Sequence, residues 1–277
     1  MHHDTVRLRA GATGFTLTEL AVVLAIVALL LGGLMYTLAA QSDQRNFEET
    51  RRRLEQAREL LLAFAIVNGR LPCPARSAAT VTPATVPGDE VRDAVTGACV
   101  GDTVTDYYGG TSGSATLGLL PARAIGFPIV DSEGFAVDAW GNRLRYAVAS
   151  LITNCSGSSI TPHFTNAANL RTNGISCQPN DLLVCKSASG ITATTCGGAA
   201  NQIMSQSLVA ALVFSTGKNG AAGAAGADEA ANLNGDRVFV WHTPTPSTAP
   251  NGEFDDQMVW ITVGELYGRM IAAGVLP

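Results

Sequence analysis

The sequence has few charged residues, which make up 15% of its 277 positions, a low share for a soluble protein. Lysine and arginine (18) are outnumbered by aspartate and glutamate (23), so the basic surplus typical of nucleic-acid binding is missing. Only four histidines are present, and two of them, His2 and His3, lie at the very start. We therefore expect neither a nucleic-acid interface nor a His-rich metal site.

Motifs of the common enzyme classes are also missing. The Gly217-Lys218 pair is not a phosphate-binding loop, because Leu212 and Asn219 stand where that motif needs glycine and then serine or threonine. No G-x-S-x-G segment occurs, and no motif joins His163 or His242 to a nucleophilic serine. We expect no enzymatic activity and interpret the two histidines as structural.

The cysteines lack any C-x-x-C pair, which argues against a zinc site. An even number of them in loop-like sequence beyond a long apolar run indicates disulfides and an oxidising compartment. From their order along the chain we predict sequence-local pairing. The predicted disulfides are Cys73–Cys99, Cys155–Cys177 and Cys185–Cys196.

One long apolar run is present, from Leu20 to Ala40, and it contains no charged residue. As a helix it measures about 30 Å, which matches the hydrocarbon core of a bilayer. A cleaved signal peptide has a shorter apolar region of about 7–15 residues. An uncleaved anchor fits the length but leaves Glu19 unexplained, because a carboxylate in an apolar setting needs a partner.

The residues before the run, Gly14-Phe15-Thr16-Leu17-Thr18-Glu19, resemble the processing motif of type IV pilins and type II secretion pseudopilins. In that family a prepilin peptidase cuts after the glycine, here Gly14, and the new first residue, here Phe15, is N-methylated. Glutamate at the fifth mature position, here Glu19, is the family's signature. The resemblance implies that residues 1–14 are a leader peptide.

The same resemblance implies a partner for Glu19. Cleavage creates an α-amino group whose pKa is about 7.7–8.0, so this group is largely protonated at neutral pH. In the family the glutamate is taken to meet this amine on a neighbouring subunit, which sets the axial register of the fibre. The implied partners are other pilin or pseudopilin subunits, the prepilin peptidase, the membrane and an inner-membrane assembly platform.

Two signals disagree about the side of the membrane on which the C-terminal part lies. Arg7 and Arg9 precede the span, but Arg45 and the run 51–53 follow it, so the positive-inside rule alone places that part inside the cell. The family resemblance and the six cysteines place it in the periplasm. We follow the latter and expect a single-pass inner-membrane protein whose head later joins a periplasmic or surface fibre.

The helical pattern continues beyond the apolar run. One stripe with the 3-4 spacing of a helix face comprises Phe47, Thr50, Leu54, Ala57, Leu61 and Phe64. The pattern ends at Asn68-Gly69, a stop signal. We predict one helix from about Thr16 to Asn68, transmembrane over about 20–40 and amphipathic beyond, so that residues 15–68 form the N-terminal helix and 69–277 a globular head.

The head contains short β-like runs separated by turn residues. The predicted strands are 143–148, 182–185, 208–214, 237–241 and 257–263, and 264–273 has helical spacing. Asp255-Asp256 is interpreted as a turn, and the polar stretch of about 154–206 as a surface insertion. The predicted fold class is α+β and pilin-like: a long N-terminal helix packed on an antiparallel β-sheet head with disulfide-bonded loops.

A second segment, 138–146, resembles the D-x-W-G-N-x-x-x-Y segment of the major pseudopilin of type II secretion. Further on, residues 215–241 loosely resemble that family's calcium loop, although Asn219 replaces an aspartate and the loop is longer. Two interpretations stay open: a flexible loop with solvated acids, or a Ca²⁺ site with oxygens from Asn219, Asp228, Glu229 and Asp236. No other cofactor is expected.

Two functions are consistent with these features. The first is a structural subunit of a type II secretion pseudopilus or a type IV pilus. Its large head favours a minor subunit, whereas the calcium-loop resemblance favours the main subunit type. The alternative is a fibre-tip adhesin or a substrate-recognition module, in which the polar insertion acts as the binding surface on a pilin anchor.

Overall fold

The computed structural model describes residues 16–76, 86–93, 99, 118–149, 152–155, 158–160, 163–176 and 178–277. The side chains of 31–40, 152–155, 158–160 and 175 are outside that description. The predicted leader with Gly14 and Phe15, and Cys177 with its predicted bond to Cys155, therefore lie outside it as well. The contacts divide the chain into two units, residues 1–45 and 46–277. The fold belongs to the α+β class, as predicted.

Helix α1, Leu17–Asn68, has 52 residues and agrees with the predicted bounds. In the first unit the large apolar side chains described, which lie between Leu17 and Leu30, are exposed, from 42% at Val27 to 86% at Leu17. Among the described residues, no helix combines the length and the apolar character needed to cross a bilayer. The span predicted at about 20–40 lies partly outside the described side chains, because it includes residues 31–40.

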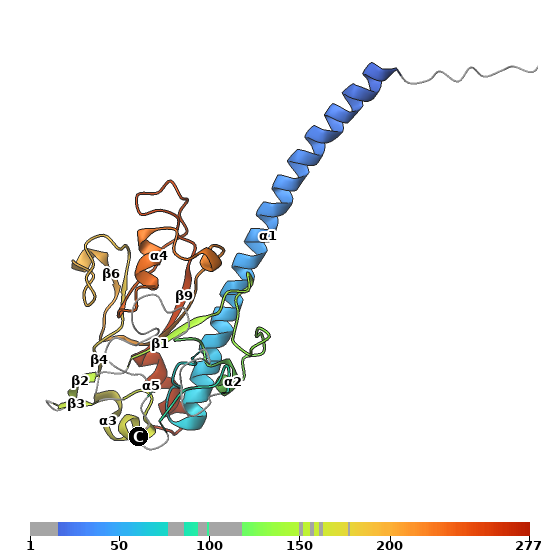
Figure 1. Ribbon diagram of the computed structural model, residues 1–277. Helices are drawn as coiled ribbons and strands as arrows, with labels where there is room; N and C mark the ends of the chain where they lie inside the picture. The colour runs from blue at the N-terminus through green and yellow to red at the C-terminus, as the bar shows by residue number, and fades with distance from the viewer. Residues whose placement is uncertain are drawn as a thin grey trace, which may run out of the picture. The chain divides into compact units, whose positions relative to one another are not determined.

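The second half of α1 is part of the head. Four of the six residues of its predicted stripe are buried, whereas Phe47 and Phe64 are partly buried. The side chains that enter the core are Leu54, Ala57, Leu61, Leu62 and Ala65. Helix α5, Val263–Ala272, lies beside this half of α1 (Figure 1), where the Arg58 guanidinium donates a hydrogen bond to Glu265 at 2.5 Å. Gly69 follows the helix with a φ of +68°, a left-handed conformation that favours glycine at a helix end.

The central sheet is antiparallel and has the strand order β1-β7-β9. Its strands are β1 (Arg145–Val148), β7 (Val209–Ser215) and β9 (Gln257–Thr262). The central strand, β7, has all its residues buried and confirms the strand predicted at 208–214. Together with α5 and the second half of α1, this sheet forms the main hydrophobic core.

Two smaller sheets complete the described strands. One, in the order β3-β2-β4, consists of β3 (Ser158–Ile160), β2 (Ile152–Cys155) and β4 (Gln178–Pro179). The other, in the order β6-β5-β8, consists of β6 (Gln202–Met204), β5 (Leu183–Cys185) and β8 (Val238–Val240). The pair β5 and β8 is parallel, unlike the antiparallel head that was predicted, because a long connection carrying β7 separates the two strands.

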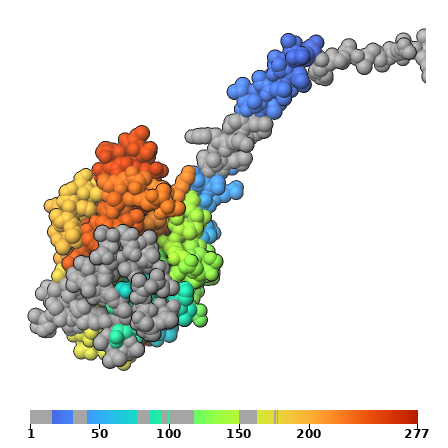
Figure 2. All heavy atoms as spheres, viewed as in Figure 1, coloured from blue at the N-terminus to red at the C-terminus, as the bar shows by residue number. Residues whose placement is uncertain are grey.

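The remaining helices are short. They are α2 (Ala122–Ile125), α3 (Ala167–Asn173) and α4 (Ala227–Asn232), with 3₁₀ turns at Gly174–Ser176, Ala199–Asn201 and Gly220–Ala222. Two predicted disulfides, Cys73–Cys99 and Cys185–Cys196, are present. In Figure 2 the orange surface that carries the chain from about residue 200 to 250 is continuous, and it includes α4.

Candidate functional site: the helix start and a buried acidic cluster

The N-terminus of α1 is capped by reciprocal hydrogen bonds between Thr16 and Glu19. The Glu19 carboxylate accepts hydrogen bonds from the Thr16 backbone N–H at 2.9 Å and from its hydroxyl at 2.8 Å. In return, the Glu19 N–H donates to Thr16 Oγ1 at 3.3 Å. This is a capping box, which satisfies backbone donors that the first helical turn leaves open. The T-x-x-E sequence signalled it, but our sequence analysis missed it.

The D-x-W-G-N segment forms a turn and attaches α1 to the head. Asp138 accepts hydrogen bonds from the backbone N–H groups of Trp140 at 2.9 Å and Asn142 at 2.8 Å. From α1, the Arg53 guanidinium donates to the Asp138 carbonyl at 2.6 Å, and Thr50 Oγ1 accepts from the Ala139 N–H at 3.1 Å. The segment therefore fixes where the helix lies on the head.

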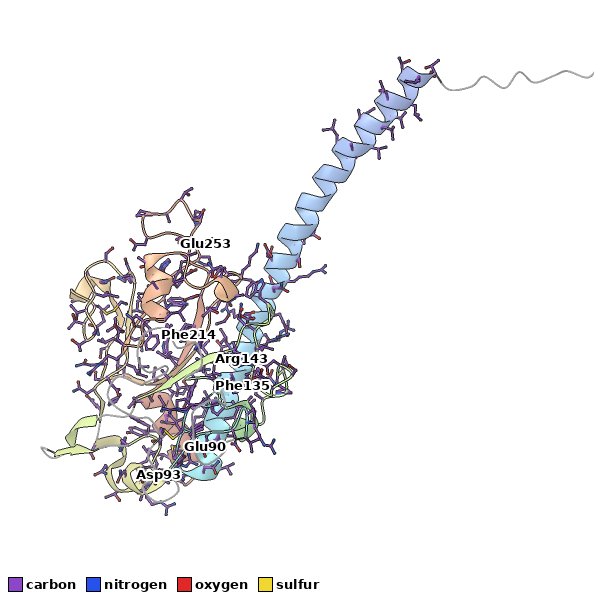
Figure 3. All side chains as sticks on the ribbon, in the orientation of Figure 1. Glu90, Asp93, Phe135, Arg143, Phe214 and Glu253 are labelled. Carbon is purple, nitrogen blue, oxygen red and sulfur yellow. A yellow bond between two sulfur atoms is a disulfide. The ribbon has the colours of Figure 1, made fainter. Side chains whose placement is uncertain are left out.

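Arg143, which follows this segment, binds the turn that begins at Asp131. Its guanidinium forms an ion pair with Asp131 at 2.7 Å and lies over the ring of Phe135, 4.3 Å from the centroid (Figure 3). The side-chain amide of Asn142 donates a hydrogen bond to the Gly217 carbonyl at 2.6 Å. The loop after β7 is thus anchored to the same turn as α1.

Two of the residues expected to bind calcium have other partners. Asp228 accepts from the Ala188 N–H at 2.5 Å and from the Asn251 amide at 3.1 Å, and it pairs with His242 at 3.1 Å. Asp236 accepts hydrogen bonds at the turn before β8, from the Val238 N–H at 2.7 Å and from the Asn234 amide at 2.8 Å. Neither belongs to a group of three acidic, histidine or cysteine ligands within the described residues.

Asn219 does meet an acidic cluster, but a different one. Glu229, in α4, and Asp255 and Asp256, just before β9, each place a carboxylate oxygen within 4.8 Å of the other two. All three residues are buried, with exposures of 1%, 7% and 3%. The Asn219 amide donates to Glu229 at 3.0 Å. The interpretation of Asp255-Asp256 as a turn missed that this pair is buried, although its place directly before an apolar strand was a signal.

Backbone donors hold the cluster in place. Glu229 accepts from the Ala225 N–H at 2.7 Å and from the Asp255 N–H at 3.0 Å, and Asp255 Oδ2 accepts from the Lys218 N–H at 2.9 Å. Asp256 accepts from the Asn232 amide at 2.7 Å. The other carboxylate oxygen of Asp255, Oδ1, is buried and has no hydrogen-bond partner.

The cluster concentrates negative charge. Two ionised carboxylates separated by 4.8 Å or less repel by at least about 3.5 kcal/mol at an effective dielectric constant of about 20. Burial, together with the charge of Glu229, raises the pKa of Asp255 to about 6, and burial holds the pKa of Asp256 well above its ordinary value. Arginines such as Arg58, Arg70 and Arg143 form ion pairs with other acids of the head. A proton or a cation at the cluster would reduce the repulsion between its carboxylates.

A groove of about 610 Å³ runs along the second half of α1 and reaches the cluster. The α1 side is formed by residues such as Phe47, Leu54 and Arg58, and the opposite side by Trp241 and Trp260. Asp256 also lines it. The groove therefore borders one of the three acids of the cluster.

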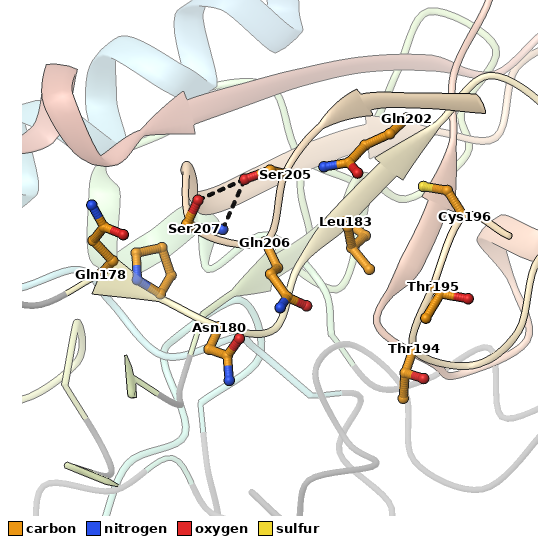
Figure 4. Close-up of a pocket in the computed structure, with 11 residues that line it drawn as sticks. Gln178, Asn180, Leu183, Thr194, Thr195, Cys196, Gln202, Ser205, Gln206 and Ser207 are labelled. Atoms are coloured by element: carbon orange, nitrogen blue, oxygen red, sulfur yellow. Dashed lines mark hydrogen bonds between the residues drawn. The ribbon is translucent and has the colours of Figure 1, made fainter. Parts of the chain in front are cut away.

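A separate pocket of about 460 Å³ lies in the region predicted to be a surface insertion (Figure 4). Amide and hydroxyl side chains dominate its lining, with Gln178, Asn180, Thr194, Thr195, Gln202, Ser205, Gln206 and Ser207 contributing. Among the described residues that line it, none has a charged side chain. Such a lining donates and accepts hydrogen bonds without charge, which suits a neutral polar ligand.

Comparison with protein-family models, with curated proteins and with solved structures finds no match to this chain.

Proposed function

We propose that this protein is a pilin-like structural subunit, cleaved after Gly14, N-methylated at Phe15 and assembled through its N-terminal helix. The assembly is a type II secretion pseudopilus or a type IV pilus, and the large head favours a minor subunit. One observation carries the proposal: α1 begins within the processing motif, at Leu17, its described apolar side chains up to Leu30 are exposed, and its second part belongs to the core of the head.

The exposed apolar side chains of α1 favour contact with lipid or with other helices. Leu17, Leu20, Leu29 and Leu30 are each more than half exposed. Burying one such side chain is worth about 1.5–3 kcal/mol, so a helix with many of them binds lipid or other helices in preference to water. A pilin-like subunit meets both in turn: the membrane before assembly and neighbouring helices within the fibre.

The capping box gives Glu19 a second role that an assembly test must separate from docking. In the capping box the side chain acts as a hydrogen-bond acceptor, which glutamine also provides. In docking it acts as a charge that meets the α-amino group of another subunit, and glutamine cannot replace that charge. The substitution Glu19→Gln therefore keeps the capping box and removes only the charge.

The test compares incorporation into fibres of the wild type, Glu19→Gln and Thr16→Ala, with Glu48→Gln as a matched control farther along the same helix. Mass spectrometry of the mature N-terminus verifies that each variant is cleaved and methylated at Phe15. We expect Glu19→Gln to reach the membrane but to be incorporated at least about tenfold less, since a loss of about 1.4 kcal/mol is tenfold. Thr16→Ala keeps the charge and should still assemble.

Two results would contradict the proposal. Mature protein that retains residues 1–14 would exclude pilin-type processing. Normal incorporation of Glu19→Gln, with loss of incorporation in Thr16→Ala, would reduce Glu19 to a helix cap.

The uncharged pocket of Figure 4 favours a second candidate function, recognition of a neutral polar ligand by the head. This role would place the protein at a fibre tip or make it a substrate-recognition module. Recognition at the pocket does not require the Glu19 charge, whereas assembly does. The two functions are therefore separate if the Glu19→Gln protein binds the ligand as tightly as the wild type but is not incorporated into fibres.

A further inference from the structure

The groove beside α1 follows an open edge of the central sheet. Among the described strands β9 pairs with β7 alone, so its other edge has no strand partner there. The consecutive residues 256–260, which include most of β9, all line the groove. Side chains along a strand point alternately to the two faces of a sheet, so consecutive residues line one groove only where it follows the strand's edge. The groove therefore lies against the open edge of β9.

The main-chain groups of two β9 residues face this edge. The Trp260 carbonyl accepts a hydrogen bond from the Arg58 guanidinium at 3.3 Å, so it is turned away from β7 and towards α1. Residues of an antiparallel strand alternate between those that bond to the partner strand and those that point away from it. Met258, two positions earlier, therefore faces the same way as Trp260. Outside the strand ladder, no described group bonds to the N–H of either residue or to the Met258 carbonyl.

Strand pairing along this segment begins just before β9 and then stops. Thr245 and Phe254 exchange two backbone hydrogen bonds, at 3.0 and 3.1 Å. Nearer the start of the same segment, the Trp241 N–H donates instead to the Cys185 carbonyl at 2.9 Å. Residues 241–244 line the groove rather than pair with β9. The place that a paired strand would fill is therefore open.

A buried side chain at the groove also lacks a partner. Gln257 lines the groove and is only 8% exposed, and its amide nitrogen has no hydrogen-bond partner in the described part of the chain. A buried donor without an acceptor is costly. Like the outward N–H groups of Met258 and Trp260, this nitrogen would be satisfied by a carbonyl oxygen of a bound chain.

The side chains around the edge indicate which chain would bind. Trp241 and Trp260 meet edge-on, with ring centroids 5.6 Å apart, and Phe47 lines the groove from α1. Aromatic surfaces of this kind bury apolar side chains. Arg58 is already paired with Glu265 at 2.5 Å, so it does not require an acid on the partner. A helix bonds its backbone groups internally and would leave the edge unused, whereas an extended peptide uses both the edge and the aromatic rings.

We propose that the groove binds an extended, uncharged peptide segment of a partner protein, which adds to the open edge of β9 as a further strand. In this mode of recognition, main-chain hydrogen bonds provide affinity, and pockets for alternate side chains provide specificity. The groove is formed entirely by residues of the second unit, 46–277. The proposal therefore does not depend on fibre assembly.

The first test measures binding of a fluorescein-labelled peptide of four Thr-Val repeats to the purified full chain in a mild detergent. Fluorescence anisotropy is the readout, with the detergent alone as a blank. Two further versions carry N-methyl groups on all threonines or on all valines. Because the N–H groups of alternate residues point to opposite edges of a strand, each version blocks one edge.

We expect one methylated version to bind at least about tenfold more weakly than the unmodified peptide, and the other to bind nearly as well. Equal affinity of all three peptides would overturn strand addition and would indicate an occupant held by side chains alone, such as an apolar helix. Failure of the unmodified peptide to bind would overturn the proposal as well.

The second test removes the donor from the protein. Met258→Pro deletes the outward N–H, and proline is tolerated on an edge strand where the N–H faces away from the neighbouring strand. Met258→Ala is the matched control, since it loses the same side chain but keeps the N–H. We expect Met258→Pro to bind the unmodified peptide at least about tenfold more weakly than Met258→Ala.

Thermal unfolding without peptide shows whether both variants are folded. Equal binding by two folded variants would overturn the proposal. If Met258→Pro does not fold, the comparison of the methylated peptides on the wild type decides the question by itself.

Discussion

His163 should make the head sensitive to acid. Its side chain is fully buried, with Nε2 3.1 Å from the Tyr267 hydroxyl and the ring edge-on to Phe164 at 4.7 Å. Its Nδ1 atom has no hydrogen-bond partner. Burial without a nearby acid disfavours the charged imidazolium and lowers the pKa of His163 from 6.5 to about 4.

The sign and size of the effect follow from the two pKa values. The unfolded chain protonates this histidine near pH 6.5 and the folded chain only near pH 4, so between these values the unfolded state binds more protons. The contribution is intact above about pH 6.5 and is lost as the pH falls towards 4. From pH 7.5 to pH 5 the loss in the free energy of unfolding is about 2 kcal/mol.

The measurement is urea unfolding of the full chain, followed by tryptophan fluorescence at pH 7.5 and pH 5, for the wild type and His163→Gln. All other groups titrate alike in both proteins, so the difference between them isolates His163. We expect the wild type to lose about 2 kcal/mol more than the variant over this range. Parallel losses in the two proteins would refute a buried neutral imidazole.

Two further predictions concern the links that hold the head together. Glu90→Gln should destabilise the head by about 3 kcal/mol in urea unfolding, because it leaves the buried Arg70 without its charged partner; a loss below about 1 kcal/mol would mean that the pair behaves as a surface ion pair. Removing the disulfide between residues separated by 11 positions, with Cys185→Ala and Cys196→Ala together, should cost about 2.8 kcal/mol by loop entropy, and unchanged stability would contradict this.

The features that sequence predicted well are encoded by neighbouring residues. The bounds of α1 follow from the apolar stripe and from Asn68-Gly69, and the glycine adopts the left-handed conformation that ends a helix. The strands β7 and β9 follow from runs rich in apolar and β-branched residues. The two described disulfides join cysteines 26 and 11 positions apart, which is why sequence-local pairing predicted them.

The missed features depend on contacts between distant segments. Helix α4 has only six residues in a glycine- and alanine-rich loop, too short for a periodic signal. Glu229 meets Asp255 and Asp256 only because the fold brings α4 to the start of β9, so no local pattern announced the cluster. The parallel pairing of β5 with β8 is long-range in the same sense. The capping box of Thr16 and Glu19 was local and was simply overlooked.

The burial of the second half of α1 has a mechanical consequence. Leu54, Ala57, Leu61 and Ala65 enter the core along the length of the helix, and Arg53 and Arg58 bind backbone carbonyls of the head on the way. Tension applied along the helix axis loads these contacts simultaneously and in shear, whereas a sideways pull would break them one after another. If such helices transmit force along a fibre, each head should therefore stay attached to its helix under axial tension.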